Sequence, residues 1–493
     1  MSKFYITTTL PYVNASPHMG HALEFVQADI IARYQRDVLG NDVFFNTGTD
    51  EHGLKIYRKA KEEGKDIQAF ADTYAEIFKQ ALNPVTGLNI NYTRFIRTTD
   101  AAHKAAAQEF WKLCAQNGDI YKKAYQTKYC VGCELEKTDS ELTDGVCPLH
   151  PNLAIELINE ENYFFRWSKY QQPLLDFYTQ HPDFVLPPSR LHEITKFVEA
   201  GLEDFSISRL KEKMPWGVPV PGDDAHVMYV WFDALVNYIS TLGWPNNNKQ
   251  FADFWGTSDQ RIGIQIAGKD NLRQQSAMWQ AMLMSAGLPN SKLIIIHGFI
   301  TSGGMKMSKT TGNVIDPLEI IHVYGTDALR YFLAREIATF EDGDFTRERF
   351  KLSYQSGLAN GLGNLVSRAL KMAVTNNVTL QDPCNTFAFD HTEVQRAYHE
   401  AMDGFNIKAA TDVIWEAITS TNKFIETTEP FKKAKVDPEA AQMDIRTLIK
   451  SIEAINGLLR PFLPETVQKI DAALKNISDD TIPRLFPRIE AKA

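Results

Sequence analysis

The chain has 493 residues and a formal net charge of −9; 44% of its residues are hydrophobic and 23% are charged. It is too long for one ordinary hydrophobic core and too apolar to be disordered, so we expect a globular protein of two to four domains. No run of about 18 apolar residues and no secretory signal is present. The negative charge argues against a chain that coats nucleic acid, although not against local basic patches, and we expect no DNA partner. These features predict a soluble cytoplasmic protein with no membrane partner.

Short β-rich runs alternate with longer helical runs in the first part of the chain. We expect strands at residues 3–10, 42–48 and 92–99, and helices between and after them at 20–38, 66–82 and 100–117. Strands separated by helices form a parallel sheet of the doubly wound type. The alternation therefore predicts an α/β domain of Rossmann type.

The alternation stops in residues 118–215, which contain a cysteine cluster and the proline-rich stretch FVLPPSR. It resumes with three expected strands at 225–233, 261–268 and 292–299. From residue 349 onward every strong segment has helical periodicity. We therefore expect one parallel sheet split by an insertion, followed by an all-α bundle.

Three of the five cysteines lie between residues 130 and 147, and an odd number in a cytoplasmic chain argues against disulfides. The ligand-type residues follow the spacing C-x2-C-x13-C-x2-H and are Cys130, Cys133, Cys147 and His150. Two such pairs wrap one tetrahedral Zn²⁺, and the four ligands leave no position for a water. We expect one structural zinc, with unmetallated thiols as the alternative, and ordinary buried thiols at Cys114 and Cys384.

A glycine-flanked loop, TSGGMKMSKTTGN, carries Lys306 and Lys309 at residues 301–313. It does not fit the P-loop pattern G-x-x-x-x-G-K-[ST]. Two ammonium groups on such a loop suit a polyphosphate, and a plain solvent loop is the alternative. The run GLGN at 361–364 falls in a helical segment and is too weak a signal for a dinucleotide site.

Two histidines, His18 and His21, surround Gly20 in the stretch SPHMGH. They are compatible with a metal pair, an acid–base couple, structural histidines or donors to an anion. A metal site needs a third ligand, and none is obvious nearby. The turn between the first strand and helix of a doubly wound sheet is a usual ligand position, and a helix N-terminus favours anions. We therefore favour an anion site.

PHMGH and KMSKT resemble the paired H-I-G-H and K-M-S-K-S signatures of class I aminoacyl-tRNA synthetases. Within that class the chain is similar to the methionyl-tRNA synthetase family in TTTLPYVNASPHMGHALEFVQADIIARYQR, NTGTDEHG, the Cys3His knuckle, NYFFRWSKYQ and MYVWFDAL. The similarity keeps its order from residue 3 to about 435. It implies a Rossmann catalytic domain in two halves, at 1–117 and 216–300, with a zinc-bearing connective insertion at 118–215 between them. A KMSKS-loop and stem-contact region follows at 301–348, and an α-helical anticodon-binding domain at 349–493.

The resemblance implies that the chain activates L-methionine with ATP and Mg²⁺, and passes the methionyl group to the 3′ end of tRNA(Met). No protein nucleophile is needed, so catalysis consists of positioning and stabilising phosphate charge. The residues implied in contacting ATP and its pyrophosphate are His18, Gly20, His21, Glu24, Lys306 and Lys309. Thr310 replaces the final serine of the family signature and Met19 replaces its isoleucine.

The resemblance also implies a methionine pocket, because an apolar, aromatic-lined slot suits a flexible thioether. The implied pocket residues are Leu10, Tyr12, Asp50, Trp231, Ala234, Tyr238, Gln275 and Trp279. Asp50 matches the residue that holds the substrate ammonium. The sequence departs from the family at Leu235, where proline is usual, and at Gln274 and Gln275, where an aromatic–histidine pair is usual.

In the helical region the resemblance implies an anticodon site. Asn364 and Arg368 are four residues apart, hence on one helix face, and match positions that read the anticodon. Phe431 stands where the family often has tryptophan, and a core aromatic is the alternative. We expect a monomer without a separate editing domain. Two competing hypotheses are a class I synthetase for another apolar amino acid and a non-catalytic tRNA-binding paralogue. A non-catalytic paralogue has no need to keep the implied ATP and methionine residues, so their presence argues against it.

Overall fold

The computed structural model describes residues 1–306, 314–379, 381 and 384–489. The chain forms two compact units, of which unit 1 comprises residues 1–17, 42–80 and 92–296, and unit 2 comprises 18–41, 81–91 and 297–493. The chain passes between the units five times, so neither unit is one continuous length of sequence. Within the described ranges every helix is too short or too polar to span a lipid bilayer.

A six-stranded sheet forms the framework of unit 1, in the order β3-β2-β1-β12-β13-β7. Its strands are β1 (Lys3–Thr8), β2 (Asp42–Thr49), β3 (Arg94–Arg97), β7 (Val185–Leu186), β12 (Ile264–Gly268) and β13 (Leu293–His297). β1 pairs in parallel with β2 on one side and β12 on the other, with Ile6 opposite Phe45 and Ile264. The doubly wound sheet is confirmed, and its strand order reverses between β1 and β12.

Two elements of the sheet differ from expectation. Residues 225–233 do not add a parallel strand: β11 (Asp223–Met228) is antiparallel to β9 (Ser208–Leu210) and β10 (Pro219–Val220), and α7 (Val230–Ala234) follows it. The first part of the expected strand is confirmed as β11, but an apolar run shows neither which strands it will pair with nor where a buried helix replaces it. The edge strand β7, which pairs with β13, comes instead from within residues 118–215 and is too short to show periodicity.

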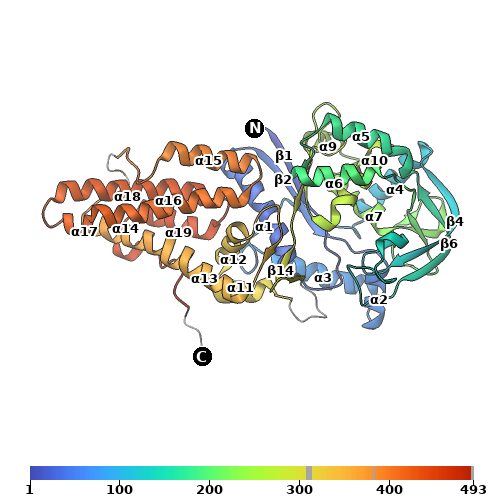
Figure 1. Cartoon of the computed structure of the whole chain (residues 1–493), viewed down its shortest axis with the longest axis horizontal. Coiled ribbons are helices and arrows are strands. Elements are labelled where there is room, and N and C mark those ends of the chain that lie inside the picture. The colour runs from blue at the N-terminus through green and yellow to red at the C-terminus, as the bar shows by residue number, and fades with distance from the viewer. Residues whose placement is uncertain (307–313, 380, 382–383, 490–493) are drawn as a thin grey trace. The chain divides into compact units, whose positions relative to one another are not determined.

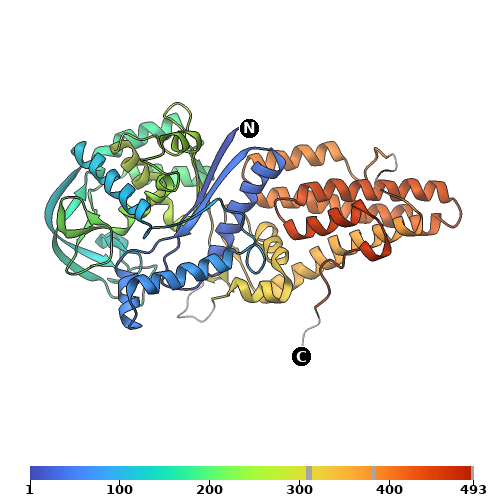
Figure 2. The same ribbon diagram turned by 180° about the vertical axis from the view of Figure 1, so that it is seen from behind.

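Helices surround this sheet, and the expected helices at 66–82 and 100–117 are confirmed as α3 (Ile67–Leu82) and α4 (Ala101–Gln116). The main core of unit 1 joins Tyr5 of β1 and Phe44 of β2 to Phe110 of α4 and Met282 of α10 (Trp279–Ser285). The arrangement can be followed from both sides (Figure 1; Figure 2). The remaining helices are α2 (Leu54–Glu62), α5 (Gln171–Gln180), α6 (Pro188–Glu199), α8 (Asn237–Ser240) and α9 (Asn248–Phe254).

A second sheet of unit 1 carries the cysteine cluster. Its order is β5-β4-β6-β8, and the strands are β4 (Ile120–Cys130), β5 (Leu135–Lys137), β6 (Glu156–Phe165) and β8 (Phe205–Ser206). The long antiparallel pair β4–β6 runs from Ile120 opposite Phe165 to Tyr129 opposite Glu156. Because β4 ends at Cys130, the first cysteine pair lies in the turn before β5.

Unit 2 begins with α1 (Met19–Arg33), which is confirmed within the expected helix 20–38. Asp29 on α1 is fully buried and forms an ion pair with Arg330 of α12 (Thr326–Tyr331) at 2.7 Å. Arg330 also donates to the carbonyl oxygens of Pro461 and Phe462, each at 2.9 Å, between α18 (Pro438–Leu459) and α19 (Pro464–Lys475). One buried guanidinium therefore connects the first helix of the chain to the last two long ones.

The remainder of unit 2 is a helical bundle preceded by a small sheet, as expected from residue 349 onward (Figure 1). The helices start where side-chain oxygens accept backbone N–H groups, as Asp390, Asn406 and Asp437 do. The elements are β14 (Ile300–Ser302), β15 (Met305–Lys306), β16 (Gly343–Asp344), α11 (Pro317–Tyr324), α13 (Arg347–Ser353), α14 (Asn364–Thr375), α15 (His391–Asp403), α16 (Ile407–Thr428) and α17 (Pro430–Lys433).

Candidate functional site

The two histidines of the opening motif cap the N-terminus of α1 in unit 2. The backbone N–H of Gly20 donates to Nδ1 of His18 at 3.1 Å, and the N–H of His18 donates to Nδ1 of His21 at 3.2 Å. The two rings stack with centroids 3.8 Å apart. A side chain at Gly20 would meet the His18 ring at 3.0 Å, so glycine leaves room for it.

This capping determines the protonation of both rings. An imidazole that accepts at Nδ1 carries its proton on Nε2, and a charged imidazolium cannot accept at all. Burial, together with the neighbouring His18, lowers the pKa of His21 well below its usual value of 6.5. His21 is therefore a neutral hydrogen-bond donor at neutral pH. Neutral Nε2–H groups at a helix N-terminus suit an anion, whereas a metal ion requires a lone pair.

The other predicted phosphate-contacting residues of unit 2 lie on α1 and on the small sheet. Glu24 is buried on α1, where its Oε2 lies 3.1 Å from Nε2 of His297. β14 contacts α1 and pairs with β15, in which the backbone of Lys306 lies opposite Thr301. Lys309 and Thr310 lie outside the described residues.

In unit 1 three of the residues predicted to bind methionine follow the carboxyl ends of neighbouring strands. Tyr12 follows β1, Asp50 follows β2 and Gln275 follows β12. Tyr12 and Asp50 form an isolated parallel bridge, and the Tyr12 ring lies edge-on to Trp231 with centroids 6.3 Å apart. Ligands of doubly wound sheets bind at this edge, beside the point where strand order reverses.

Asp50 is a buried carboxylate without a cation. It is 3% exposed and accepts a long hydrogen bond from Thr98 at 3.5 Å, and no ion pair to it occurs among the described residues. Burial, and next the charge of Asp233, raise its pKa well above the usual 3.8. A buried anion with a raised pKa is stabilised by an incoming cation, so the site favours an ammonium group.

A histidine–aspartate network behind Asp50 was not predicted from the sequence. Asp233 Oδ2 lies 3.1 Å from Nδ1 of His52, and its Oδ1 lies 3.8 Å from Nε2 of His103. His103 Nδ1 in turn lies 2.9 Å from the Ser240 hydroxyl. Burial by itself would raise the pKa of Asp233, but the two histidines lower it on balance. The network ties the loop after β2 to α7, which carries Trp231.

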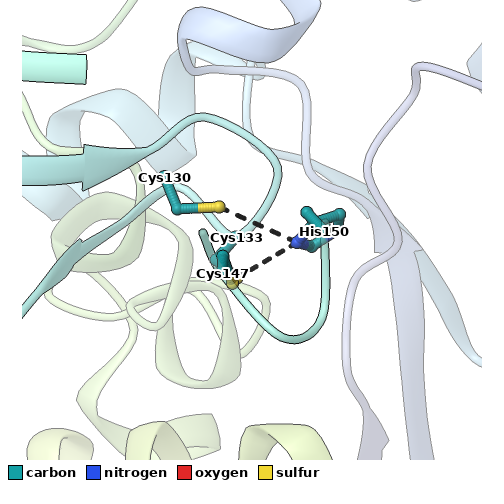
Figure 3. A group of neighbouring side chains, drawn as sticks. All are labelled: Cys130, Cys133, Cys147 and His150. Carbon is teal, nitrogen blue, oxygen red and sulfur yellow. Dashed lines mark hydrogen bonds between the residues drawn. The ribbon is translucent and has the colours of Figure 1, made fainter. Parts of the chain in front are cut away.

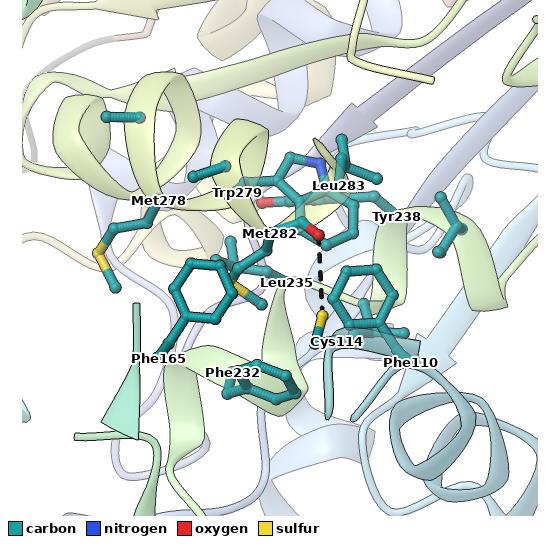
Figure 4. Packing of buried hydrophobic residues seen from close by; sticks show 14 of the residues in the cluster. Phe110, Cys114, Phe165, Phe232, Leu235, Tyr238, Met278, Trp279, Met282 and Leu283 are labelled. Carbon is teal, nitrogen blue, oxygen red and sulfur yellow. Dashed lines mark hydrogen bonds between the residues drawn. The ribbon is translucent and has the colours of Figure 1, made fainter. Parts of the chain in front are cut away.

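A second group of predicted pocket residues lies in the main core. Tyr238 and Trp279 are buried there with ring centroids 5.9 Å apart, beside Leu235 (Figure 4). Gln275 donates to the Tyr238 hydroxyl at 2.7 Å. Ala234 is also buried, on α7, and Leu10 is partly buried.

Several polar atoms around these residues have no hydrogen-bond partner in the described parts of the chain. They belong to side chains of the predicted pocket and its neighbour: Tyr12 Oη, Trp231 Nε1, Gln274 Oε1 and Trp279 Nε1. Buried polar atoms are usually satisfied, and an exception indicates a missing water or ligand.

Cys130, Cys133, Cys147 and His150 converge in unit 1, with all ligand atoms within 4.8 Å of one another (Figure 3). Cys133 Sγ lies 3.5 Å from Cys147 Sγ and 3.3 Å from Nδ1 of His150, which is 3.8 Å from Cys130 Sγ. Ligands about 2.0–2.3 Å from a tetrahedral zinc are about 3.5–3.8 Å apart. These residues form a group that can hold a metal ion.

The turn that contains Cys130 and Cys133 packs closely against His150. A Cβ on Gly132 would lie 2.4 Å from Cγ of His150, so the turn requires glycine. Burial and the neighbouring Cys130 thiol raise the pKa of Cys133. Burial by itself would raise the pKa of Cys147, but hydrogen bonds from neighbouring backbone N–H groups and thiols lower it on balance. A bound cation compensates the charge of the thiolates.

The predicted anticodon residues lie on the helical bundle. Asn364 is exposed at the start of α14, and Arg368 is half-buried one turn later on the same face. Phe431 on α17 is 46% exposed, which argues against the alternative of a core aromatic. Of the remaining cysteines, Cys114 is a buried thiol as expected, whereas Cys384 is only partly buried, because it lies in the connection before α15.

Comparison with known proteins places the chain in a class and then in a family. A family model for class I tRNA synthetases (M) matches residues 4–154 and 150–370, which agrees with the doubly wound sheet and the capping histidines. A second model, the anticodon binding domain of methionyl tRNA ligase, matches residues 379–489. The chain belongs to the methionine–tRNA ligase family.

Relatives and solved structures support this placement. The methionine–tRNA ligase of Thermotoga maritima is 42% identical over 483 residues, covering 95% of this chain and 74% of the relative. That of Thermosynechococcus vestitus is 42% identical over 477 residues, covering 95% and 89%. The structure of Mycobacterium tuberculosis methionyl-tRNA synthetase in complex with methionyl-adenylate matches with a TM-score of 0.89 at 35% identity, covering 99% of this chain and 97% of that one.

Proposed function

We propose that the chain is a methionine–tRNA ligase. It joins L-methionine to ATP, releases pyrophosphate, and passes the methionyl group from the adenylate to the 3′ end of tRNA(Met). The observation that carries the reaction class is the pair of capping histidines. Their Nδ1 atoms accept backbone N–H groups, so the Nε2–H donors are oriented before any substrate binds.

In the activation step the methionine carboxylate attacks the α-phosphorus of ATP. Negative charge develops on the phosphate oxygens, and donors held in advance stabilise it without reorganisation. We assign this role to the Nε2–H groups of His18 and His21, with Gly20 and Glu24 in the ATP site. Lys306 and Lys309 supply positive charge to the departing pyrophosphate. Mg²⁺ accompanies ATP and neutralises part of the phosphate charge.

Methionine binding is assigned to unit 1. Asp50 supplies the buried negative charge that holds the substrate ammonium. The aromatic and apolar side chains form the slot for the thioether: Leu10, Tyr12, Trp231, Ala234, Tyr238 and Trp279. Gln275 contacts the slot through Tyr238.

The metal at the knuckle is assigned as zinc. Three thiols and one imidazole form a soft donor set in near-tetrahedral spacing, which suits Zn²⁺. All four positions are filled by protein, so this zinc is structural, holding the turn after β4 in place. Asn364, Arg368 and Phe431 are assigned to anticodon contact, and the chain to a cytoplasmic monomer.

Pyrophosphate exchange with each of the twenty amino acids tests this proposal. We expect ATP-dependent exchange with methionine far above that with the other nineteen, and subsequent charging of tRNA(Met). Exchange with another apolar amino acid would assign a different substrate. Binding of tRNA without any exchange would identify a non-catalytic paralogue.

A further inference from the structure

Glu134 directly follows Cys133 of the knuckle and is buried, with 1% of its surface exposed. Its backbone has a φ of 54°, in the left-handed region, which costs free energy for a residue other than glycine. Such a conformation persists where the surrounding contacts fix it, and it is common at functional positions. The contacts of Glu134 connect it to two segments of the proposed methionine slot.

The carboxylate of Glu134 caps α2, the helix that follows Asp50. The N-cap residue of α2 is Gly53, which has no side chain to accept the first free N–H groups of the helix. Oε1 of Glu134 accepts the backbone N–H of Lys55 instead, at 2.6 Å. A Cβ on Gly53 would lie 3.1 Å from that oxygen, so glycine allows the close approach. Glu134 therefore holds the end of the loop that begins at Asp50.

The backbone of Glu134 holds a second segment of the slot. The hydroxyl of Tyr229 donates to the carbonyl oxygen of Glu134, and Tyr229 is the N-cap residue of α7, the helix that carries Trp231. On the side-chain end of Glu134, the hydroxyl of Tyr129 donates to the carboxylate. Both tyrosines are buried, so bulk water does not compete for these hydrogen bonds. One residue therefore binds both the loop after Asp50 and the start of α7.

Tyr12 shows that these two segments meet at the slot. Its ring lies edge-on to Trp231 of α7, with centroids 6.3 Å apart, and Nζ of Lys55 on α2 lies 5.6 Å from its centroid. The two tyrosines that bond to Glu134 form a small core with Val230, and Tyr12 and Trp231 pack against this core. A shift of either segment would therefore displace side chains that are proposed to contact methionine.

We propose that Glu134 is a positioning residue for methionine binding, because it fixes the segment after Asp50 and the start of the helix that carries Trp231 relative to each other. The inference rests on the proposed function, which places Asp50 and Trp231 in the methionine site. The contacts that support it lie within unit 1, whereas His18 and His21, the proposed phosphate donors, belong to unit 2. We therefore expect Glu134 to affect the binding of methionine and not that of ATP.

Glu134→Ala and Glu134→Gln test the cap on α2. Alanine removes the acceptor of the Lys55 N–H, whereas glutamine keeps an amide oxygen that can accept it. In pyrophosphate exchange we expect the KM for methionine to rise about 2- to 30-fold in Glu134→Ala, the range for one lost helix cap. The kcat and the KM for ATP should stay near their wild-type values, and Glu134→Gln should restore most of the affinity for methionine.

Asp139→Ala is the matched control, because Asp139 belongs to the same knuckle but is 85% exposed at its side chain and pairs with Lys128. We expect its KM for methionine, and the metal content of all these variants, to equal those of the wild type. An equal rise in Asp139→Ala, or a rise in Glu134→Ala that accompanies metal loss and recurs in Cys147→Ser, would assign the effect to the knuckle as a whole. A parallel change in kcat and in the KM values for ATP and methionine would show a merely structural role. Each of these results overturns the inference, as does a wild-type KM for methionine in Glu134→Ala.

Tyr229→Phe provides a second variant if Glu134→Ala does not fold. It removes only the hydroxyl that bonds to the Glu134 carbonyl oxygen, and we expect the KM for methionine to rise about 2- to 10-fold, the range for one hydrogen bond, with kcat maintained. An unchanged KM for methionine in this variant also refutes the inference. Failure of the proposed function is distinguishable, because the wild-type chain would then show no exchange with methionine.

Discussion

Replacing His21 by asparagine or glutamine separates the two tasks that the structure gives this imidazole. Its Nδ1 caps α1 by accepting the His18 N–H at 3.2 Å, and its Nε2–H is the proposed donor to phosphate. Asparagine places an oxygen near the position of Nδ1 but does not reach the position of Nε2. Glutamine places an N–H near the position of Nε2 but loses the cap.

The two losses differ in size and in the property they affect. Loss of one transition-state donor costs about 10²–10³-fold in rate, so we expect His21→Asn to lower methionine-dependent exchange by that factor with near-normal stability. Loss of a helix cap costs about 0.5–2 kcal/mol, so we expect His21→Gln to melt at a lower temperature and to retain more activity than His21→Asn.

The pH dependence of the exchange rate and of stability tests the proposed role of His21 independently. Because the pKa of His21 lies well below 6.5, its contribution to the rate should be constant from about pH 7 to 8.5. The unfolded chain binds a proton at this residue near pH 6.5 and the folded chain does not, so the stability from His21 is complete above that pH and declines below it.

Steady-state exchange and thermal melting of the three proteins, measured at several pH values, check these expectations. The reasoning is refuted if His21→Asn exchanges at nearly the wild-type rate. It is also refuted if the wild-type rate falls as pH rises from 6 to 8 and this fall is absent from His21→Asn, because that pattern identifies a charged imidazolium.

Three further predictions concern other parts of the chain. Elemental analysis should find one zinc per chain, and Cys147→Ser should lose it and impair tRNA charging more than methionine activation; zinc-free, fully active wild-type protein would contradict this. The KM for methionine should rise as pH falls through the raised pKa of Asp50, and Asp233→Asn should move this rise to lower pH, because removing a neighbouring negative charge lowers that pKa; superimposable curves would exclude the coupling. Phe431→Ala should reduce charging while exchange is unchanged and stability shifts by no more than about 0.5 kcal/mol, since the ring is 46% exposed; unchanged charging would remove Phe431 from the anticodon site.

Local patterns were sufficient to predict much of the fold. The alternation of strands and helices predicted the parallel sheet because each of these elements has its own periodicity. The Cys and His spacing predicted the knuckle because its ligands lie within 21 residues of one another, at 130–150. The strand expected at 225–233 was found only as β11, in a different and antiparallel sheet, because an apolar run does not show which strands it pairs with or where a buried helix takes over.

Side-chain networks between residues far apart in the chain could not be predicted from the sequence. His52, His103 and Asp233 meet only because β2, α4 and α7 pack together in unit 1. Gln265 and Gln275 were ten residues apart in sequence, but nothing in the pattern indicated that their amides bond directly. The sequence showed that Gln274 and Gln275 depart from the family, but not that Gln275 bonds to Tyr238 while the Gln274 side-chain oxygen has no partner among the described residues.

The buried ion pair between Asp29 and Arg330 also has a consequence for biosynthesis. The partners are 301 positions apart, and Arg330 itself relies on carbonyl oxygens at positions 461 and 462. At about 5–20 residues per second, the ribosome makes Arg330 roughly 15–60 s after Asp29. During this interval Asp29 can pair with Arg33 on the same helix, at 2.7 Å, but not yet with Arg330. The N-terminal segment therefore leaves the ribosome long before it can complete its native contacts, and the local pair with Arg33 holds the Asp29 carboxylate until Arg330 and the carbonyl oxygens at 461 and 462 are made.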